Sequence, residues 1–378
     1  MNADNNNIMI LAGEPSGDIH GGHLCREIKK LSPRIQLFGM GGPEMELAGV
    51  ELIHRIGNTG VIGFWEVYKE IGKYWKIFKK MVKVLEERRP DAVILIDYPG
   101  FNIRFAKKAN RLGIKVYYYI SPQLWAWGQW RIKKIRRSVD KMLVIFPFEK
   151  KFYNSHGIEA EFVGHPLIGT LNPDLRKEEC QKILGISSSP VIGLLPGSRK
   201  GEIEKILPIL IKTAEIIREK IPESDFILPI ASSELRPLIE VQLKHTPVKI
   251  KTREGSAEEI IAASDLLILA SGTVTLEASL FLTPMIIVYR ISFFSWLMGR
   301  ILLKIPYIGL VNIVRGEKIV PEFIQHQAKP EMIAQAGVDI ITKPGSRERM
   351  IGELKIVRDE LGRPGAAGRA AGIIINSL

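Results

Sequence analysis

The sequence has few cysteines and no long uninterrupted apolar segment. Two of its 378 residues are cysteine, Cys25 and Cys180, too few and too far apart for a disulfide framework or a metal-ligand cluster. Their scarcity favours a reducing, cytoplasmic compartment, and the first residues show no signal-peptide pattern. Charged residues such as Arg290, Arg300 and Lys304 interrupt the most apolar region. No stretch therefore reaches the roughly 20 apolar residues that a membrane-spanning helix requires.

Two motifs that commonly hold nucleotides are also absent. The chain contains neither an Asp-x-Asp pair, which would carry a metal ion on a diphosphate, nor the Gly-Lys-Ser/Thr of a P-loop. His20 and His23 have the spacing of a metal-ligand pair, but no third ligand is near them in the sequence. We therefore expect no metal site and no cofactor.

What the chain does carry is positive charge. It has 53 Lys and Arg against 41 Asp and Glu, a formal net charge of +12. Nucleic acid, an anionic membrane surface and phosphorylated substrates are the partners that such a surplus suits. No nucleic-acid recognition module is evident in the sequence, so we expect no nucleic-acid partner.

Short apolar runs alternate with segments of helical periodicity in both halves of the chain. This order is typical of an α/β fold with parallel sheets. We expect two Rossmann-like domains, residues 1–168 and 185–350, followed by a tail, residues 351–378. The segment 362–369 of this tail is Gly/Ala-rich, and we expect its last residues to be loosely ordered. The expected strands are residues 8–12, 35–39, 92–96, 115–120, 141–146, 191–195, 225–229, 248–251, 266–269 and 285–289.

The most informative motif follows the apolar run at residues 191–195. The chain turns at Pro196-Gly197, continues with Ser198 and Arg199, and then takes up helical periodicity. A strand that turns through glycine into a helix presents backbone N–H groups and the positive end of the helix dipole to anions. The guanidinium of Arg199 suits two phosphate oxygens at once. The motif therefore predicts a diphosphate site.

A second turn of this kind is Ser271-Gly272-Thr273, again after an apolar run. Glu277, about one helical turn later, could accept hydrogen bonds from a ribose. Together the two turns predict a two-part cradle for a nucleotide diphosphate in the second domain.

Polar residues also follow expected strands of the first domain, where ligands collect in such sheets. Ser16 and Asp18 either cap a helix or contact a substrate. Asp97 ends a strand and is a natural general base, unless it only hydrogen-bonds its own turn. Asn102 would orient a sugar hydroxyl or cap the next helix.

The segment 120–128 contains Gln123, a further candidate for a substrate contact, and two tryptophans, Trp125 and Trp127. Two tryptophans so close together after a strand and a proline do not suit a core. They indicate a contact with a sugar face or an acyl chain, or a contact between domains.

Residues 64–85 have the pattern of a basic amphipathic helix. Phe64, Trp65, Tyr68 and Trp75 are among its apolar positions, and lysines fill most of the others. Such a helix suits an anionic membrane surface. The alternative is a helix packed on its own sheet with a solvated lysine face.

Six motifs, which follow one another along the chain, resemble those of the lipid-A-disaccharide synthases, a family of inverting glycosyltransferases. They are residues 13–18, 96–102, 121–127, 195–199, 270–273 with Glu277, and Asn312 before Glu317. The resemblance implies a GT-B architecture, in which two Rossmann-like domains face each other across a cleft and the C-terminal helix often crosses back. It also implies a reaction in which UDP-2,3-diacylglucosamine donates its sugar to 2,3-diacylglucosamine 1-phosphate, giving a β-1,6-linked disaccharide 1-phosphate and UDP.

By position, Asp97 corresponds to the family's essential aspartate and Arg199 to its essential arginine. The resemblance places the remaining nucleotide and substrate contacts at Gly197, Ser198, Ser271, Gly272, Thr273, Glu277 and Asn312. Gly100 stands where the family commonly has a second Asp, so Asp97 is the only carboxylate of this loop.

The acylated substrates imply peripheral association with the cytoplasmic face of the inner membrane of a diderm bacterium, and a homodimer is left open. A non-hydrolysing UDP-sugar epimerase of the same architecture is the rival interpretation. It would need neither an acyl pocket nor a membrane face.

Overall fold

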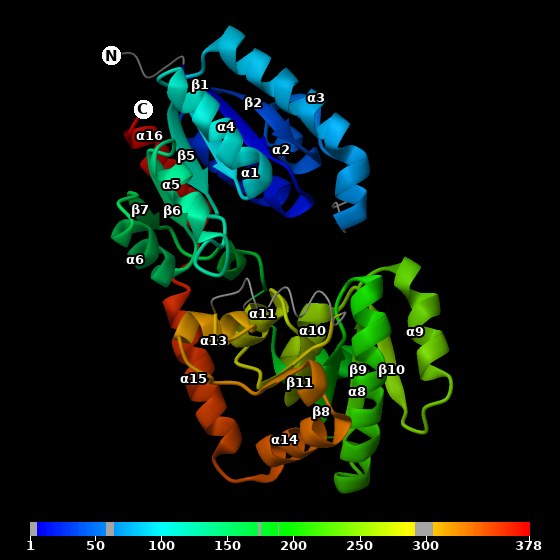
Figure 1. The fold of residues 1–378 in the computed structure, drawn as a ribbon. Helices are drawn as coiled ribbons and strands as arrows, with labels where there is room; N and C mark the ends of the chain where they lie inside the picture. Colours follow the sequence, from blue (N-terminus) through cyan, green and yellow to red (C-terminus); the bar gives the residue numbers. More distant parts are fainter. Residues whose placement is uncertain (1–5, 58–63, 173–174, 188, 292–304) are drawn as a thin grey trace. The chain divides into compact units, whose positions relative to one another are not determined.

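The chain folds into two compact units. The computed structural model describes residues 6–57, 64–172, 175–187, 189–291 and 305–378, and of residues 64–71 the backbone only. Unit 1 comprises Met1–Gly169 with Leu361–Leu378, and unit 2 comprises Thr170–Glu360. Figure 1 shows both units with their helices and strands labelled.

Unit 1 is built on a seven-stranded sheet in which every described pairing is parallel. Across the sheet the strands are β3 (Glu51–Arg55), β2 (Gln36–Gly41), β1 (Asn7–Ala12), β4 (Ala92–Ile96), β5 (Lys115–Tyr119), β6 (Lys141–Val144) and β7 (Ala160–Phe162). The helices are α1 (Pro15–Leu31), α2 (Pro43–Leu47), α3 (Phe64–Arg88), α4 (Pro99–Arg111), α5 (Ile132–Arg136), α6 (Pro147–Ser155) and α16 (Ala366–Asn376). Strand β4 is buried along its whole length because helices cover both faces of the sheet.

The two faces of this sheet form separate cores, since alternate strand residues point to opposite sides. Met9 and Leu95 join the apolar side chains of α3 and α4. Ile10 and Ile94 join those of α1 and α16. The C-terminal helix therefore covers part of the core of unit 1.

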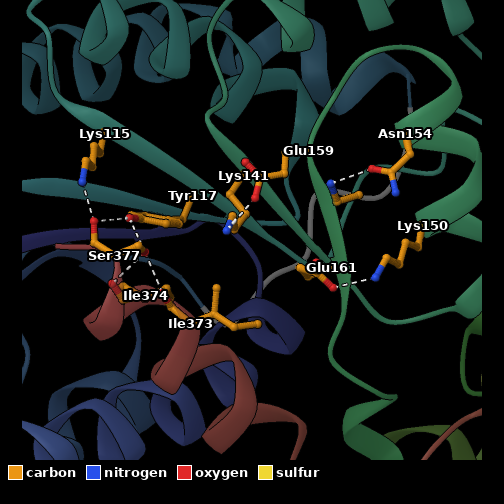
Figure 2. A network of polar contacts seen from close by, with 11 residues as sticks. Lys115, Tyr117, Lys141, Lys150, Asn154, Glu159, Glu161, Ile373, Ile374 and Ser377 are labelled. Atoms are coloured by element: carbon orange, nitrogen blue, oxygen red, sulfur yellow. Dashed lines mark hydrogen bonds and ion pairs between the residues drawn. The ribbon is translucent and has the colours of Figure 1, made fainter.

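Helix α16 is fixed to unit 1 by small residues and by its last turn. Ala370, Ala371 and Ile374 are fully buried, and the helix packs along α1. The hydroxyl groups of Tyr117 and Ser377 lie 2.8 Å apart, and Lys115 donates to the carbonyl of Ser377 (Figure 2). The expectation that the last residues are loosely ordered is wrong, because small side chains let α16 (Ala366–Asn376) pack closely on unit 1.

Unit 2 repeats the plan with a six-stranded sheet whose described pairings are all parallel. Its strand order is β10 (Ile250–Glu254), β9 (Asp225–Ile230), β8 (Val191–Leu195), β11 (Leu266–Ala270), β12 (Met285–Tyr289) and β13 (Glu322–Ile324). The helices are α7 (Lys177–Ile183), α8 (Lys200–Lys220), α9 (Arg236–Leu243), α10 (Ala257–Ala263), α11 (Val274–Leu280), α13 (Leu310–Arg315), α14 (Pro330–Thr342) and α15 (Ser346–Glu360).

The α/β class with two parallel sheets is confirmed. Each of the ten expected strands overlaps a strand of the structure. Strands β3, β7 and β13 were not expected from the sequence, and all three lie at sheet edges. Residues 351–360, which the sequence assigned to the tail, belong to α15 of unit 2.

Among the described residues, no helix is both long and apolar enough to cross a membrane. Within the same residues, His, Cys, Asp and Glu side chains nowhere gather in a group of three that could hold a metal ion.

Candidate active site

In unit 1 the candidate residues follow neighbouring parallel strands. Ala12 pairs with Ile96, and Ile96 with Tyr119, at the ends of β1, β4 and β5. The loops that follow these strands therefore meet at one edge of the sheet. A cavity of about 220 Å³ lies there, and Asp97, Gln123 and Trp127 are among the residues that line it.

Asp97 is held in an unusual backbone conformation at this edge. Asp97 and Tyr98 have φ of +43° and +46°, in the left-handed region that residues other than glycine seldom occupy. The Asp97 carbonyl accepts hydrogen bonds from the Tyr118 hydroxyl at 2.6 Å and from Asn102 Nδ2 at 2.8 Å. These bonds stabilise the strained turn from which the Asp97 side chain projects.

The carboxyl group of Asp97 has the electrostatics of a base that works near neutral pH. Burial, and next the negative charge of Glu14, raise its pKa to about 6. Glu14 comes close because the β1–α1 turn packs against the Asp97 turn. A Cβ on Gly13 would lie 2.1 Å from the Tyr98 ring, so this approach requires glycine.

A second buried carboxyl group, Glu149, lines the same cavity. Its Oε1 accepts hydrogen bonds from Ser121 Oγ at 2.7 Å and Trp125 Nε1 at 3.0 Å. Its Oε2 accepts the backbone N–H groups of Ile145 and Phe146 at 3.2 and 3.0 Å. Burial raises the pKa of Glu149 to about 7 although four hydrogen bonds oppose this shift.

Sequence reasoning missed Glu149. The available signal was a proline followed two residues later by glutamate, which is typical of a helix start. That signal predicts a cap, as observed, but it does not predict that the same carboxylate holds the loop 121–125. Trp125 is buried against Phe148, whereas Trp127 is exposed and lines the cavity.

Three predicted contact residues of unit 1 lie in different environments. Ser16 is exposed in the first turn of α1. Asp18 is buried and accepts the backbone N–H groups of Gly42, Glu44 and Met45 at 2.7–3.1 Å. It therefore holds the start of α2. Asn102 is fully buried and donates to the carbonyls of Ile96 and Asp97, so we assign it to positioning Asp97 rather than to a sugar.

In unit 2 the two predicted turns are also neighbours. Leu195 of β8 pairs with Leu269 of β11, so the segments 196–199 and 271–273 leave the same edge of the sheet side by side. Gly197 has φ of +110°, which makes glycine the residue that this turn requires.

The backbone N–H groups at the first of these turns are not free. Glu202 Oε2 accepts those of Ser198 and Arg199 at 3.2 and 3.3 Å, as a capping box at the start of α8. The side chain of Arg199 is 66% exposed, and its Nη1 lies 3.7 Å from Glu202 Oε1. Arg199 therefore presents its charge to solvent, while Glu202 holds the position that an anion would take.

At the second turn, Gly272 has open space around it and Thr273 is exposed. Ser271 Oγ donates to the carbonyl of Ile308 at 2.8 Å. Burial, and next the charge of Glu258, raise the pKa of Glu277 above its usual range.

Asn312 has a structural role in unit 2. Its Nδ2 donates to Glu322 Oε1 and to the Val320 carbonyl, and its Oδ1 accepts the N–H groups of Ile319 and Val320. All of its hydrogen-bonding capacity is used within the chain, so we assign Asn312 to holding this segment rather than to a direct sugar contact.

Helix α3 shows the packed side of an amphipathic helix over its described side chains. Phe78, Met81 and Leu85 are buried in the core of unit 1, and Trp75 is 44% exposed. The predicted contacts Phe64, Trp65 and Tyr68 lie outside the residues whose side chains are described.

Comparison with known families identifies the class of protein to which this chain belongs. The family model described as lipid-A-disaccharide synthetase matches residues 8–361. The chain belongs to the lipid-A-disaccharide synthase family. The resemblance inferred from the motifs is thereby confirmed.

Relatives with this name match over nearly the whole chain. The lipid-A-disaccharide synthase of Geobacter metallireducens is 40% identical over 377 residues, covering 100% of this chain and 98% of the relative. That of Geobacter sulfurreducens is 41% identical over 372 residues, covering 98% and 97%. The chain is thus a glycosyltransferase of lipid A biosynthesis.

Solved structures agree on the fold. The UDP-GlcNAc 2-epimerase of Neisseria meningitidis, bound to UDP-GlcNAc, has a TM-score of 0.61 at 14% identity and covers 98% of this chain and 99% of its own. The MurG of Acinetobacter baumannii has a TM-score of 0.61 at 12% identity, covering 98% and 99%. At such identities the likeness shows the GT-B class of fold.

Proposed function

We propose that this chain transfers 2,3-diacylglucosamine from its UDP-linked donor to the 6-hydroxyl of 2,3-diacylglucosamine 1-phosphate, with inversion at the anomeric carbon. The products are a β-1,6-linked disaccharide 1-phosphate and UDP. The observation that carries the proposal is Asp97, a partly buried carboxylate in a strained turn at a cavity, with its pKa raised to about 6. Family membership supports the choice of substrates.

In the proposed reaction, Asp97 takes the proton from the acceptor hydroxyl. The oxygen attacks the anomeric carbon from the face opposite UDP, the bond to the diphosphate breaks, and UDP leaves with the electron pair. One base suffices for a single displacement of this kind. Arg199, together with the turn 271–273 on the neighbouring strand, stabilises the charge that develops on the leaving phosphate.

This role predicts the kinetic effect of replacing Arg199. Its guanidinium meets more negative charge in the transition state than in the bound donor, so Arg199→Ala should lower kcat more than it weakens donor binding. A loss of about 100-fold or more in kcat is expected for a preorganised electrostatic contact. An unchanged kcat would contradict the leaving-group role.

The reaction itself is tested with purified protein, both diacylated substrates and EDTA, followed by mass spectrometry. The expected product is the disaccharide 1-phosphate, formed equally well with the chelator. Absence of the disaccharide, or near-normal turnover in Asp97→Ala, would overturn the proposal. Incubation with UDP-N-acetylglucosamine alone tests the epimerase alternative, for which an epimer would appear.

Because both proposed substrates carry acyl chains, we also propose peripheral association with the inner face of the inner membrane through α3. The exposed Trp75 and the lysines of α3 support it: Lys76, Lys79 and Lys83 are all exposed. Attraction of this kind weakens as salt screens it. Partitioning between membrane and soluble fractions should therefore shift toward the soluble fraction at high ionic strength.

A further inference from the structure

A second surface of unit 1 combines exposed aromatic rings with positive charge. It follows the segment that lines the Asp97 cavity and comprises Trp127, Trp130, Arg131, Lys133 and Lys134, here called the Trp130 patch. Trp127 and Trp130 are 42% and 65% exposed. A tryptophan left this open to water forgoes the burial that usually stabilises it, which indicates a partner for this surface.

Two cations of the patch, Arg131 and Lys134, lie over the tryptophan rings. Arg131 Cζ is 4.8 Å from the Trp127 ring centroid and 5.0 Å from that of Trp130. Lys134 Nζ is 5.0 Å from the centroid of Trp130. These are cation–π distances, so rings and charges form one preorganised surface.

The positive charge of this segment is not neutralised locally. Lys133, Lys134, Arg136 and Arg137 are all exposed. Within the described part of the chain, no carboxylate forms an ion pair with them or with Arg131. An anionic partner would supply the missing charge.

The patch is attached rigidly to the fold. Ile132 and Ile135 alternate with the cations and are buried in the core of unit 1. Lys133 and Lys134 therefore project from a short, anchored helix, α5, and Arg131 from the 3-10 turn directly before it. Little conformational entropy would be lost when they bind.

We propose that the Trp130 patch binds an anionic phospholipid surface. Tryptophan favours the interface between headgroups and acyl chains, and lysine and arginine favour anionic headgroups. Nucleic acid would instead need open ring faces on which bases stack, and here Arg131 and Lys134 already lie over the rings. The patch adjoins the Asp97 cavity through Trp127, so it would hold that cavity at the surface from which an acylated acceptor comes. This last point rests on the proposed function.

The test measures co-sedimentation of the full chain with vesicles of phosphatidylcholine, with and without phosphatidylglycerol. Trp130→Ser should weaken binding to the anionic vesicles at low and at high salt, because it removes an apolar contact. Lys133→Glu/Lys134→Glu should weaken binding about tenfold or more at low salt, given the attraction expected for each cation near an anionic surface. All three residues are exposed, so both variants should keep the thermal stability of the unchanged protein.

The matched control is Lys244→Glu/Lys249→Glu, which makes the same change of net charge at two exposed positions of unit 2. It should bind anionic vesicles far better than Lys133→Glu/Lys134→Glu. The proposal is overturned if either patch variant binds as the unchanged protein does, if the control falls equally, or if the patch variants lose RNA binding while keeping vesicle binding.

Glycosyl transfer is measured separately, with detergent-dispersed substrates and no vesicles. A chain that binds vesicles through the patch but makes no disaccharide overturns the proposed function and leaves the patch standing. If the chain makes disaccharide but its patch variants bind vesicles normally, the patch proposal is overturned and the proposed function stands.

Discussion

At the residue scale, the raised pKa of Asp97 has two causes, burial and one neighbouring charge, and the charge can be changed by itself. Burial shifts the pKa most, and the carboxylate of Glu14 adds to the shift. Both favour the protonated acid, whereas a general base must be deprotonated. The rate should therefore rise with pH through about 6 and level off above it.

Glu14→Gln isolates the contribution of the neighbouring charge. Removing it lowers the pKa of Asp97, so the acidic limb of the kcat/KM profile should move to lower pH, whatever happens to the maximal rate. Glu86→Gln, at an exposed position of α3, is the control and should leave the limb in place. A limb that does not move in Glu14→Gln would show that another group titrates.

Glu202 gives a prediction of the opposite kind, because in the proposed site it would compete with the diphosphate for the same N–H groups. Its carboxylate accepts the N–H groups of Ser198 and Arg199 and would repel a bound diphosphate. Glu202→Gln removes that charge, so UDP should bind about two- to fivefold tighter, the size of a single charge at a helix N-terminus. Isothermal titration with UDP measures this, and weaker binding would mean that Glu202 supports the site.

Sequence patterns located the polar residues at strand ends but could not tell which of them face a ligand. Asp18, Asn102 and Asn312 are buried, and their side chains hydrogen-bond to backbone groups of the fold. Gly42, which Asp18 holds, is 24 residues away in the sequence, whereas Asn102 holds the carbonyl of Asp97, five residues away. Only the folded loops determine whether such a side chain is already occupied.

At the scale of elements, Glu149 joins the loop after β5 to the start of α6. Each of its oxygens accepts two hydrogen bonds. In Glu149→Gln an amide N–H2 replaces one acceptor and faces two donors, which should cost about 2 kcal/mol of unfolding free energy. Ser121→Ala removes only one of the four hydrogen bonds, so it should lower the unfolding free energy by less. Chemical denaturation of both variants measures the difference.

The pH dependence of stability shows whether Glu149 acts as an ionisable group or only as a hydrogen-bonding side chain. Its pKa rises from 4.5 to about 7 on folding, so the folded state binds the proton more tightly. The contribution of Glu149 to stability should therefore fall as pH rises from about 4.5 to about 7. Glu149→Gln should lack this part of the dependence, and an identical pH profile in both proteins would contradict the assignment.

The interior strands could be predicted and three of the edge strands could not. Strands β4, β8 and β11 are buried on both faces and therefore read as continuous apolar runs. Strand β3 is at most half-buried, and β13 has three residues. An edge strand pairs on one side and needs no apolar run, so its sequence does not differ from that of a loop.

At the scale of the whole molecule, unit 1 is discontinuous in sequence and unit 2 is not. Ile374 of α16 and Leu354 of α15 are each fully buried, in units 1 and 2 respectively. Ile374→Ala should destabilise unit 1 by about 2–5 kcal/mol, the cost of truncating a buried aliphatic side chain. In calorimetry, the transition temperature of unit 1 alone should fall.

Leu354→Ala is the matched control and should lower the transition of unit 2 instead. If both variants lower the same transition, the two units do not unfold independently, and the division of the core between α15 and α16 would not describe their energetics.

The return of α16 to unit 1 also sets an order of events during synthesis. Unit 2 is a continuous stretch and can complete its core as it leaves the ribosome. Unit 1 is made first, yet the part of its core that α16 covers stays open until residues 366–376 have emerged. In a nascent-chain protease assay, we expect unit 2 to become resistant before unit 1, although it is translated later.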